Sequence, residues 1–153
     1  MMLQDIEVKC QGRLRYYGSD LHGLDHLREV ALLAGHIAAE MGSDVEASMV
    51  AGFLHDCGRM NDGGGNQHAH DSAKLAEPIL AECFLNLDAP AILEAIRLHA
   101  DGLTTDDPIA GALWDADRLT LIRLGMKVRP ELLSTSAARR MLAQGWHIVP
   151  RGH

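Results

Sequence analysis

The chain has few aromatic residues, three cysteines and no long apolar run, and each scarcity excludes a class of protein. Aromatic residues make up 4% of its 153 residues, while 47% are apolar, so packed helices are favoured over a β-sandwich. The cysteines have no Cys-x-x-Cys spacing and their odd number leaves one unpaired, so no disulfide framework is expected. No stretch approaches the roughly 18 uninterrupted apolar residues of a membrane span, so no membrane partner is expected.

Positive charge is also scarce. The chain carries 14 Lys and Arg against 21 Asp and Glu, a net charge of −7, without the clustered basic surface that duplex nucleic acid requires. A small phosphorylated ligand stays compatible with this charge, because a metal ion and one or two basic residues can hold it. The N-terminus lacks a basic segment followed by an apolar one, so we expect a cytoplasmic protein.

Apolar residues recur at helical spacing through most of the chain. Residues 1–20 are expected to be irregular with room for one short helix, and the segment 61–66 (NDGGGN) is expected to be a loop. Its glycines, Gly63–Gly65, are either a lid or an inert flexible loop. The tail from residue 144 is expected to be loosely ordered. We predict an all-α protein with a single compact domain over 1–153 and its core at about 20–125. The predicted helices span 23–41, 45–55, 69–84, 90–100, 107–123 and 134–143.

The most informative pair is His55-Asp56, which ends the apolar run Met49–Leu54. A buried imidazole next to a buried carboxylate costs several kcal/mol unless something compensates both, and a metal ion is the usual compensation.

Further ligand-type side chains share faces with apolar stripes on other helices, and His68 follows the glycine-rich loop. Asp115 and Asp117 lie about 200° apart around their helix, so both cannot face one ion, and the leucine stripe favours Asp117. A core histidine bonded to a carbonyl is the simpler interpretation of each residue singly, but the whole set favours a metal site. The side chains predicted to face the interior are His26, His55, His99 and Asp117.

The segments HGLDHLREVALLAGHIA, AGFLHDCGRMND, HAHDSAKLA, RLHADG and DADRL together resemble the HD-domain superfamily of metal-dependent phosphohydrolases, over about residues 20–125. The HG…H start and the DGLT…WDADRL stretch are similar to small stand-alone bacterial HD proteins. The resemblance implies an HD-domain-like helical bundle and a divalent ion held by His26, His55, Asp56 and Asp117.

Members with a second ion carry ligands at the positions of His68 and His99, and Asp56 would then bridge the two ions. Such members often have a His-His pair where this chain has His99-Ala100, so the number of bound ions, one or two, stays open. Asp101 is either a turn residue or a hydrogen-bond partner of a ligand histidine. Arg59 follows the HDxG pattern, where many members carry a Lys or Arg near the substrate phosphate.

The expected function is hydrolysis of a nucleotide or another small phosphoester by a metal-activated water. Asp56 would serve chiefly as a ligand, and Arg59 would offset charge on the phosphate oxygens. Two imidazoles and two carboxylates suit Mn, Fe, Zn, Co, Ni or Mg. Two other interpretations stay open, a non-catalytic metal-binding HD module and a di-iron HD-type oxygenase.

Overall fold

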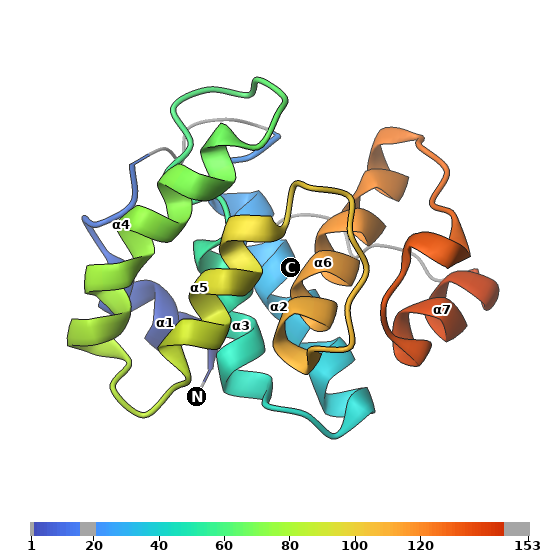
Figure 1. Ribbon diagram of the computed structural model, residues 1–153, viewed down its shortest axis with the longest axis horizontal. Helices are drawn as coiled ribbons and strands as arrows, with labels where there is room; N and C mark the ends of the chain where they lie inside the picture. The colour runs from blue at the N-terminus through green and yellow to red at the C-terminus, as the bar shows by residue number, and fades with distance from the viewer. Residues whose placement is uncertain (1, 16–20, 146–153) are drawn as a thin grey trace.

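The computed structural model describes residues 2–15 and 21–145, and within these ranges it contains helices and no strands (Figure 1). The predicted all-α class is therefore confirmed. Two short 3-10 helices, η1 (Thr120–Leu124) and η2 (Pro130–Leu132), lie between the last two α-helices. The α-helices are α1 (Leu3–Cys10), α2 (Leu24–Met41), α3 (Val45–Leu54), α4 (Gln67–Cys83), α5 (Ala89–Leu98), α6 (Pro108–Leu119) and α7 (Ser136–Ala143).

Helix starts follow from capping side chains. The carboxylates of Asp44 and Asp107 accept hydrogen bonds from backbone N–H groups in the first turns of α3 and α6, and the Thr135 hydroxyl does the same for α7. The helix predicted over 107–123 is shorter than expected, because its α-helical part ends at Leu119 and the chain tightens into η1. Most of the predicted loose tail, residues 146–153, lies outside the described residues.

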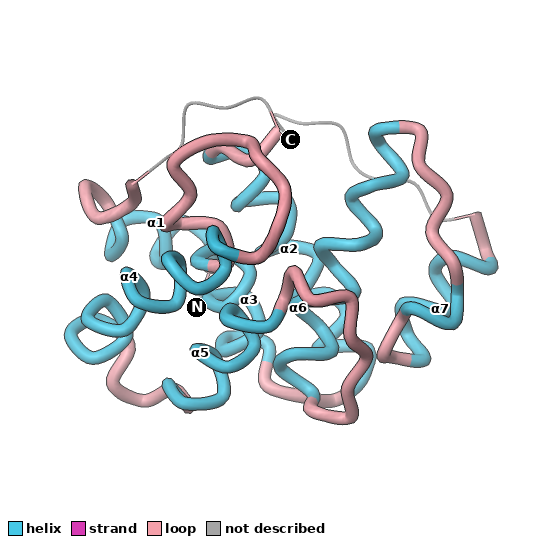
Figure 2. Tube along the Cα trace, turned by 45° about the horizontal axis from the view of Figure 1, so that its top comes forward, coloured by secondary structure: helices cyan, strands magenta, loops and turns pink. Residues whose placement is uncertain are grey.

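Helix α3 forms the centre of the molecule. Every residue from Ala47 to Leu54 is buried, and α2, α5 and α6 pack around the helix. Helices α4 and α7 lie toward opposite ends of the molecule (Figures 1 and 2). The close packing of α2 on α3 requires glycine at position 52, because a Cβ there would lie 2.8 Å from the Ala31 Cα atom.

A second close approach fixes the start of α4 beside the end of α3. A Cβ at Gly58 would lie 2.6 Å from the Ser72 backbone nitrogen, and the Gly58 N–H donates to the Ser72 hydroxyl at 2.9 Å. The buried Cys57 thiol also contacts the Ser72 carbonyl. The turn after α3 and the first turns of α4 are therefore held together as one unit.

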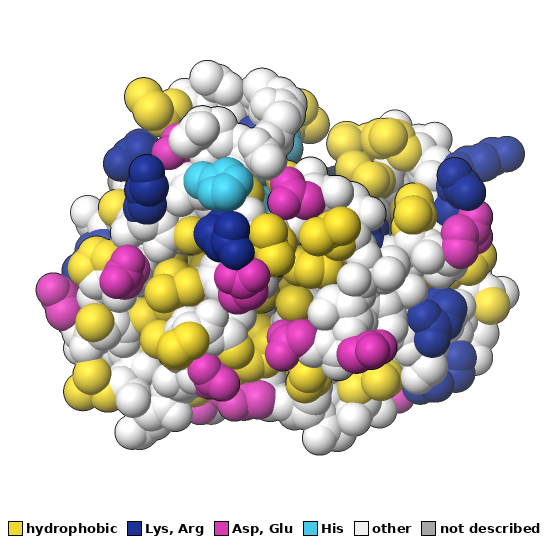
Figure 3. Space-filling view, viewed as in Figure 1, with side chains coloured by type: hydrophobic (Ala, Val, Ile, Leu, Met, Phe, Trp, Pro, Cys, Tyr) yellow, Lys and Arg dark blue, Asp and Glu magenta, His cyan; other side chains and the backbone are white. Residues whose placement is uncertain are grey.

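The face in Figure 3 carries acidic side chains scattered among apolar ones, while Lys and Arg stand in small separate groups. This face shows no continuous basic stripe. None of the helices in 2–15 and 21–145 has the length and apolar character needed to cross a bilayer.

Candidate metal centre

Five helices deliver the six predicted ligand side chains to one place. His26 lies in the first turn of α2, His68 in the first turn of α4, and Asp117 in the last turn of α6. His55 and Asp56 follow the last residue of α3, and His99 follows the last residue of α5. The structure thus brings together residues up to 91 positions apart, from His26 to Asp117. Their role as metal ligands stays a prediction.

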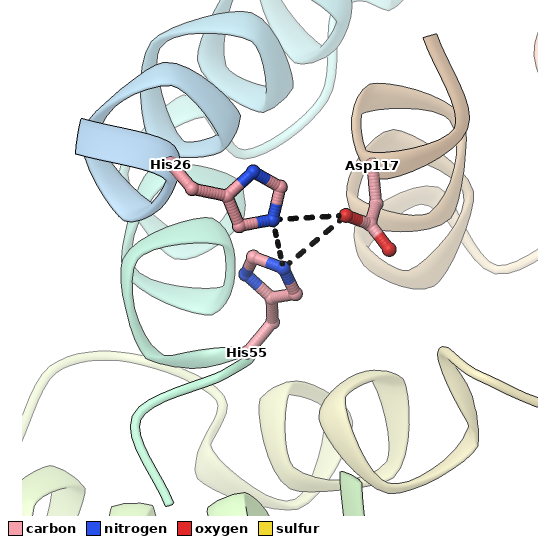
Figure 4. A group of neighbouring side chains, drawn as sticks. All are labelled: His26, His55 and Asp117. Atoms are coloured by element: carbon pink, nitrogen blue, oxygen red, sulfur yellow. Dashed lines mark hydrogen bonds and ion pairs between the residues drawn. The ribbon is translucent and has the colours of Figure 1, made fainter. Parts of the chain in front are cut away.

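One part of the centre is a triangle of two imidazoles and a carboxylate (Figure 4). The Nε2 atoms of His26 and His55 lie 3.2 Å apart, and each lies 3.3 Å from Asp117 Oδ1. Three side chains from three different helices therefore point their ligand atoms at one position.

Asp56 lies between this triangle and a second pair of histidines. Its Oδ2 atom is 3.6 Å from His26 Nε2 and 3.4 Å from His55 Nε2. Its Oδ1 atom faces the other way, 3.3 Å from His99 Nε2 and 3.6 Å from His68 Nε2. The two carboxylate oxygens are therefore shared between two groups of imidazoles, which is the arrangement of a bridging ligand.

Two backbone carbonyls set the orientation of the histidines that follow helices. The Nδ1–H of His55 donates to the Gly52 carbonyl at 2.6 Å, and that of His99 donates to the Ile96 carbonyl at 2.7 Å. A carbonyl only accepts, so Nδ1 carries a proton and Nε2 is the nitrogen left to bind a ligand. Sequence reasoning treated a histidine bonded to a carbonyl as the alternative to a ligand histidine. In the structure Nδ1 makes the carbonyl bond and Nε2 still faces the centre.

The alternative role suggested for Asp101 is not found. Its carboxylate accepts from the Asn66 side chain at 3.0 Å, at the end of the glycine-rich loop. Ile96, rather than Asp101, is the hydrogen-bond partner of His99.

The centre concentrates negative charge in a buried place. Burial lowers the pKa of His55, but Asp56 and Asp117 raise it further, so the pKa of His55 is about 9. Burial raises the pKa of Asp117, and the charge of His55 together with hydrogen bonds from His26 and His55 lowers it well below its usual range. The pKa of Asp56 is also lowered, by His55 and His99 against burial. Without an ion, a proton on His55 therefore offsets part of the carboxylate charge.

The donor set fits a divalent cation. The buried Asp56 Oδ1 atom, which faces His99 and His68, has no hydrogen-bond partner within the described residues. Buried polar atoms are normally satisfied, so an unsatisfied carboxylate oxygen that faces two imidazoles indicates a missing partner. Imidazole nitrogens and carboxylate oxygens are ligands for borderline and hard divalent ions.

Arg59 lies inside the centre, where its side chain is 7% exposed. Its Nε atom is 3.2 Å from Asp56 Oδ2, and its Nη2 atom is 3.1 Å from His68 Nε2. The Nη1 atom donates to the carbonyls of Asn61 and Gly63. Sequence reasoning predicted a basic group near substrate but not its contact with a candidate ligand.

The loop 61–66 is irregular, as predicted, and is attached at both ends. Asp62 Oδ1 lies 2.8 Å from His22 Nδ1, and Asn66 bonds to Asp101. The His22 ring packs edge-on against the His26 ring, with centroids 5.6 Å apart. The loop thus connects the region preceding α2 with the turn after α5, beside the centre.

Asp115 faces away from the centre. Its carboxylate accepts hydrogen bonds from the backbone N–H groups of Ser134 and Thr135, both at 2.7 Å, and from the Thr135 hydroxyl. Of the two aspartates on α6, Asp117 is the one that faces the imidazoles, as the helical spacing predicts.

Comparisons with known proteins place these residues in a family. The HD domain model matches residues 23–122. Ribonuclease Y from Syntrophobacter fumaroxidans is 35% identical over 133 residues, which are 86% of this chain and 24% of that protein. Ribonuclease Y from a Sulfurovum species is 34% identical over 134 residues, 86% of this chain and 25% of its own length. The chain therefore spans about a quarter of these curated relatives.

A solved structure has a similar fold. The crystal structure of a predicted HD superfamily hydrolase from an uncultured Thermotogales bacterium superposes with a TM-score of 0.66. The match covers 93% of this chain and 81% of the other at 24% identity. The family supports a metal-dependent phosphohydrolase in general terms, without a substrate. Because the family model matches 100 of its 153 residues, this chain belongs to the HD-domain family.

Proposed function

We propose that the chain hydrolyses a nucleotide or another small phosphoester at a centre of one or two divalent ions. The observation that carries this proposal is Asp56, whose two oxygens face two different groups of imidazoles in a buried place. Two adjacent ion sites bridged by one carboxylate are a recurrent arrangement in enzymes that transfer phosphoryl groups. The identity of the family supports the same reaction class.

The residues of the centre would have different roles, in binding metal and in binding phosphate. His26, His55, Asp56 and Asp117 would hold one ion, and Asp56, His68 and His99 would hold a second. Such ions, when bound, supply an activated water and offset charge on the phosphoryl oxygens. Arg59 places a buried positive charge beside Asp56, where it can neutralise a phosphate group. The Asp117 side chain is 28% exposed while His55 is fully buried, so the Asp117 side offers access from solvent.

A second candidate substrate is RNA, favoured by the similarity to ribonuclease Y over 86% of this chain. The net charge of −7 weighs against a long electrostatic footprint on nucleic acid. A short oligonucleotide, or one end of a longer strand, is compatible with that charge because few phosphates need to be contacted.

A phosphoester panel tests the proposal. The chain is stripped of metal with a chelator, reloaded with Mn²⁺, and assayed on p-nitrophenyl phosphate, bis-p-nitrophenyl phosphate, nucleotides and single-stranded oligoribonucleotides. We expect metal-dependent turnover of at least one substrate, lost in Asp117→Asn and retained in the matched variant Asp115→Asn.

The same panel separates the alternatives. Protein that retains bound metal but turns over none of these substrates would support a non-catalytic binding module. Oxygen consumption by a reduced di-iron sample, without phosphoester turnover, would support an oxygenase. Release of nucleotides from the oligoribonucleotide alone would favour the RNA substrate over the small phosphoester.

A further inference from the structure

The two groups of imidazoles around Asp56 differ in the charged side chain beside them, which is Asp117 in the first group and Arg59 in the second. In the first group, His26 and His55 face each other and Asp117. In the second, the Arg59 Nη2 atom lies 3.1 Å from His68 Nε2, the nitrogen that faces Asp56 Oδ1. A cationic side chain of this chain therefore already contacts one candidate ligand atom.

This contact competes directly with an ion. A neutral imidazole has a single acceptor nitrogen, so His68 Nε2 cannot accept from Arg59 and bind a metal at the same time. The Arg59 contact with Asp56 Oδ2 is less restrictive, because a carboxylate oxygen offers more than one lone pair.

The position of Arg59 is fixed by backbone groups rather than by side-chain packing alone. Its Nη1 atom donates to the carbonyls of Asn61 at 3.2 Å and Gly63 at 2.9 Å. These bonds satisfy one end of the guanidinium and leave its other end directed at His68 and Asp56. A second divalent ion at His68 and His99 would therefore meet a positive charge in a buried place, where repulsion is only weakly screened.

We propose that Arg59 supplies a permanent positive charge on the His68 side of the centre. A second divalent ion then binds weakly there until an anionic phosphate group binds the guanidinium in place of His68. The first ion, among His26, His55 and Asp117, meets no such competition at an imidazole nitrogen, because Arg59 reaches that side only through Asp56 Oδ2. This inference rests on the proposed metal-dependent function. It adds an order of binding, in which the first ion binds alone and the second ion binds together with the phosphate group.

Titration of the full chain with Mn²⁺ tests the first half of the inference, with calorimetry for affinity and electron paramagnetic resonance to count bound ions. In the unsubstituted chain we expect a second ion at least about tenfold weaker than the first, as expected for a buried neighbouring charge. In Arg59→Gln the second affinity should rise at least about fivefold and the first should change less than about twofold. Unchanged second-ion affinity in this variant, or two equal sites in the unsubstituted chain, would overturn the inference.

The matched control is Arg139→Gln, which makes the same change in net charge. Arg139 also donates to a backbone carbonyl, that of Leu133 at 2.9 Å, but on the segment that leads into α7. Its substitution should leave both Mn²⁺ affinities unchanged. An equal gain in Arg139→Gln would show that overall charge, rather than the Arg59 contact, controls the second ion.

A second measurement needs no variant and applies even if Arg59→Gln does not fold. Methylphosphonate, a non-hydrolysable phosphate analogue, should strengthen the second Mn²⁺ site of the unsubstituted chain at least about fivefold, because it offers the guanidinium another partner. No strengthening would overturn the inference while leaving the first ion, and the proposed function, in place. A chain that binds no Mn²⁺ at all would instead contradict the proposed function itself.

Discussion

At the residue scale, the two aspartates of α6 have different roles, one structural and one in the candidate metal centre. Asp115 is fully buried, and its carboxylate oxygens accept hydrogen bonds from Ser134 and Thr135, which hold the segment before α7 in place. Asp117, two positions later, directs an oxygen at His26 and His55. The same side chain therefore has two different roles according to the helix face on which it lies.

Substituting each aspartate by asparagine should give opposite results. Asp117→Asn should lose most of the bound metal, because an amide is a much weaker ligand than a carboxylate. Asp115→Asn should keep the metal and lower the free energy of unfolding by about 1–3 kcal/mol, the usual cost of a mismatched buried hydrogen bond. Elemental analysis and urea unfolding measure the two quantities. Metal loss in Asp115→Asn with retention in Asp117→Asn would reverse our assignment.

The raised pKa of His55 predicts a coupling between metal and protons. With a pKa of about 9, His55 is protonated at neutral pH when no ion is bound. Because an imidazole must lose its Nε2 proton to bind a metal, binding at pH 7.5 should release about one proton per chain from His55. Apparent affinity should weaken as pH falls and stop rising above about pH 9. Calorimetry in buffers of different ionisation enthalpy counts the protons, and a count of zero contradicts this account.

At the element scale, the site depends on how closely helices approach. Gly52 lets α3 meet α2, which brings His55 to His26, and Gly58 lets the turn after α3 meet α4, which brings Asp56 to His68. In both places a Cβ atom would meet backbone, which cannot move out of the way as the end of a side chain can. These contacts define the distance between the ligands.

Gly58→Ala should therefore disturb the His68 side of the centre selectively. The new methyl group would lie 2.6 Å from the Ser72 nitrogen and push α4 away, at a cost of about 1–3 kcal/mol in unfolding free energy. We expect the first Mn²⁺ ion to remain and the second to weaken. Gly64→Ala is the matched control, because nothing lies within 4 Å of its Cβ. Equal second-ion affinities and equal free energies of unfolding in the two variants would contradict this explanation by packing.

The sequence predicts the elements better than the contacts between them. Apolar spacing and capping residues locate the helices, and the helical phase of Asp117 places it on the face that meets His26 and His55. The early end of α6 was not predictable, since residues 120–124 keep an apolar pattern while adopting a tighter 3-10 geometry. The contact between Arg59 and His68 depends on the path of the loop 61–66, which no periodicity describes.

At the scale of the whole molecule, the centre joins α2, α3, α4, α5 and α6, so an ion bound there would tie most of the fold together. Further ion pairs join elements outside the centre. Arg28 on α2 pairs with Glu7 on α1, and Arg123 on η1 pairs with Glu29 on α2 at 2.9 Å. These pairs need no metal, so we expect the chain to fold without an ion but with lower stability.

Metal should accordingly raise the midpoint of thermal unfolding. At a free concentration 100 times its dissociation constant, an ion that binds only the folded state raises the free energy of unfolding by about 2.7 kcal/mol. For a chain of this size that corresponds to roughly 5–10 °C. Thermal scans of chelator-treated protein with and without Mn²⁺ measure the shift. The Asp117→Asn variant should show little of it, and an equal shift in that variant would mean that the ion binds elsewhere.

The most direct test of the account is the position of a bound ion. Crystals grown with Mn²⁺ and measured near its absorption edge should show an anomalous peak within bonding distance of His26 Nε2, His55 Nε2 and Asp117 Oδ1. A second, weaker peak should lie between Asp56 Oδ1 and His99. Peaks confined to surface carboxylates, with none at these imidazoles, would contradict the central claim that the buried His/Asp cluster is a metal centre.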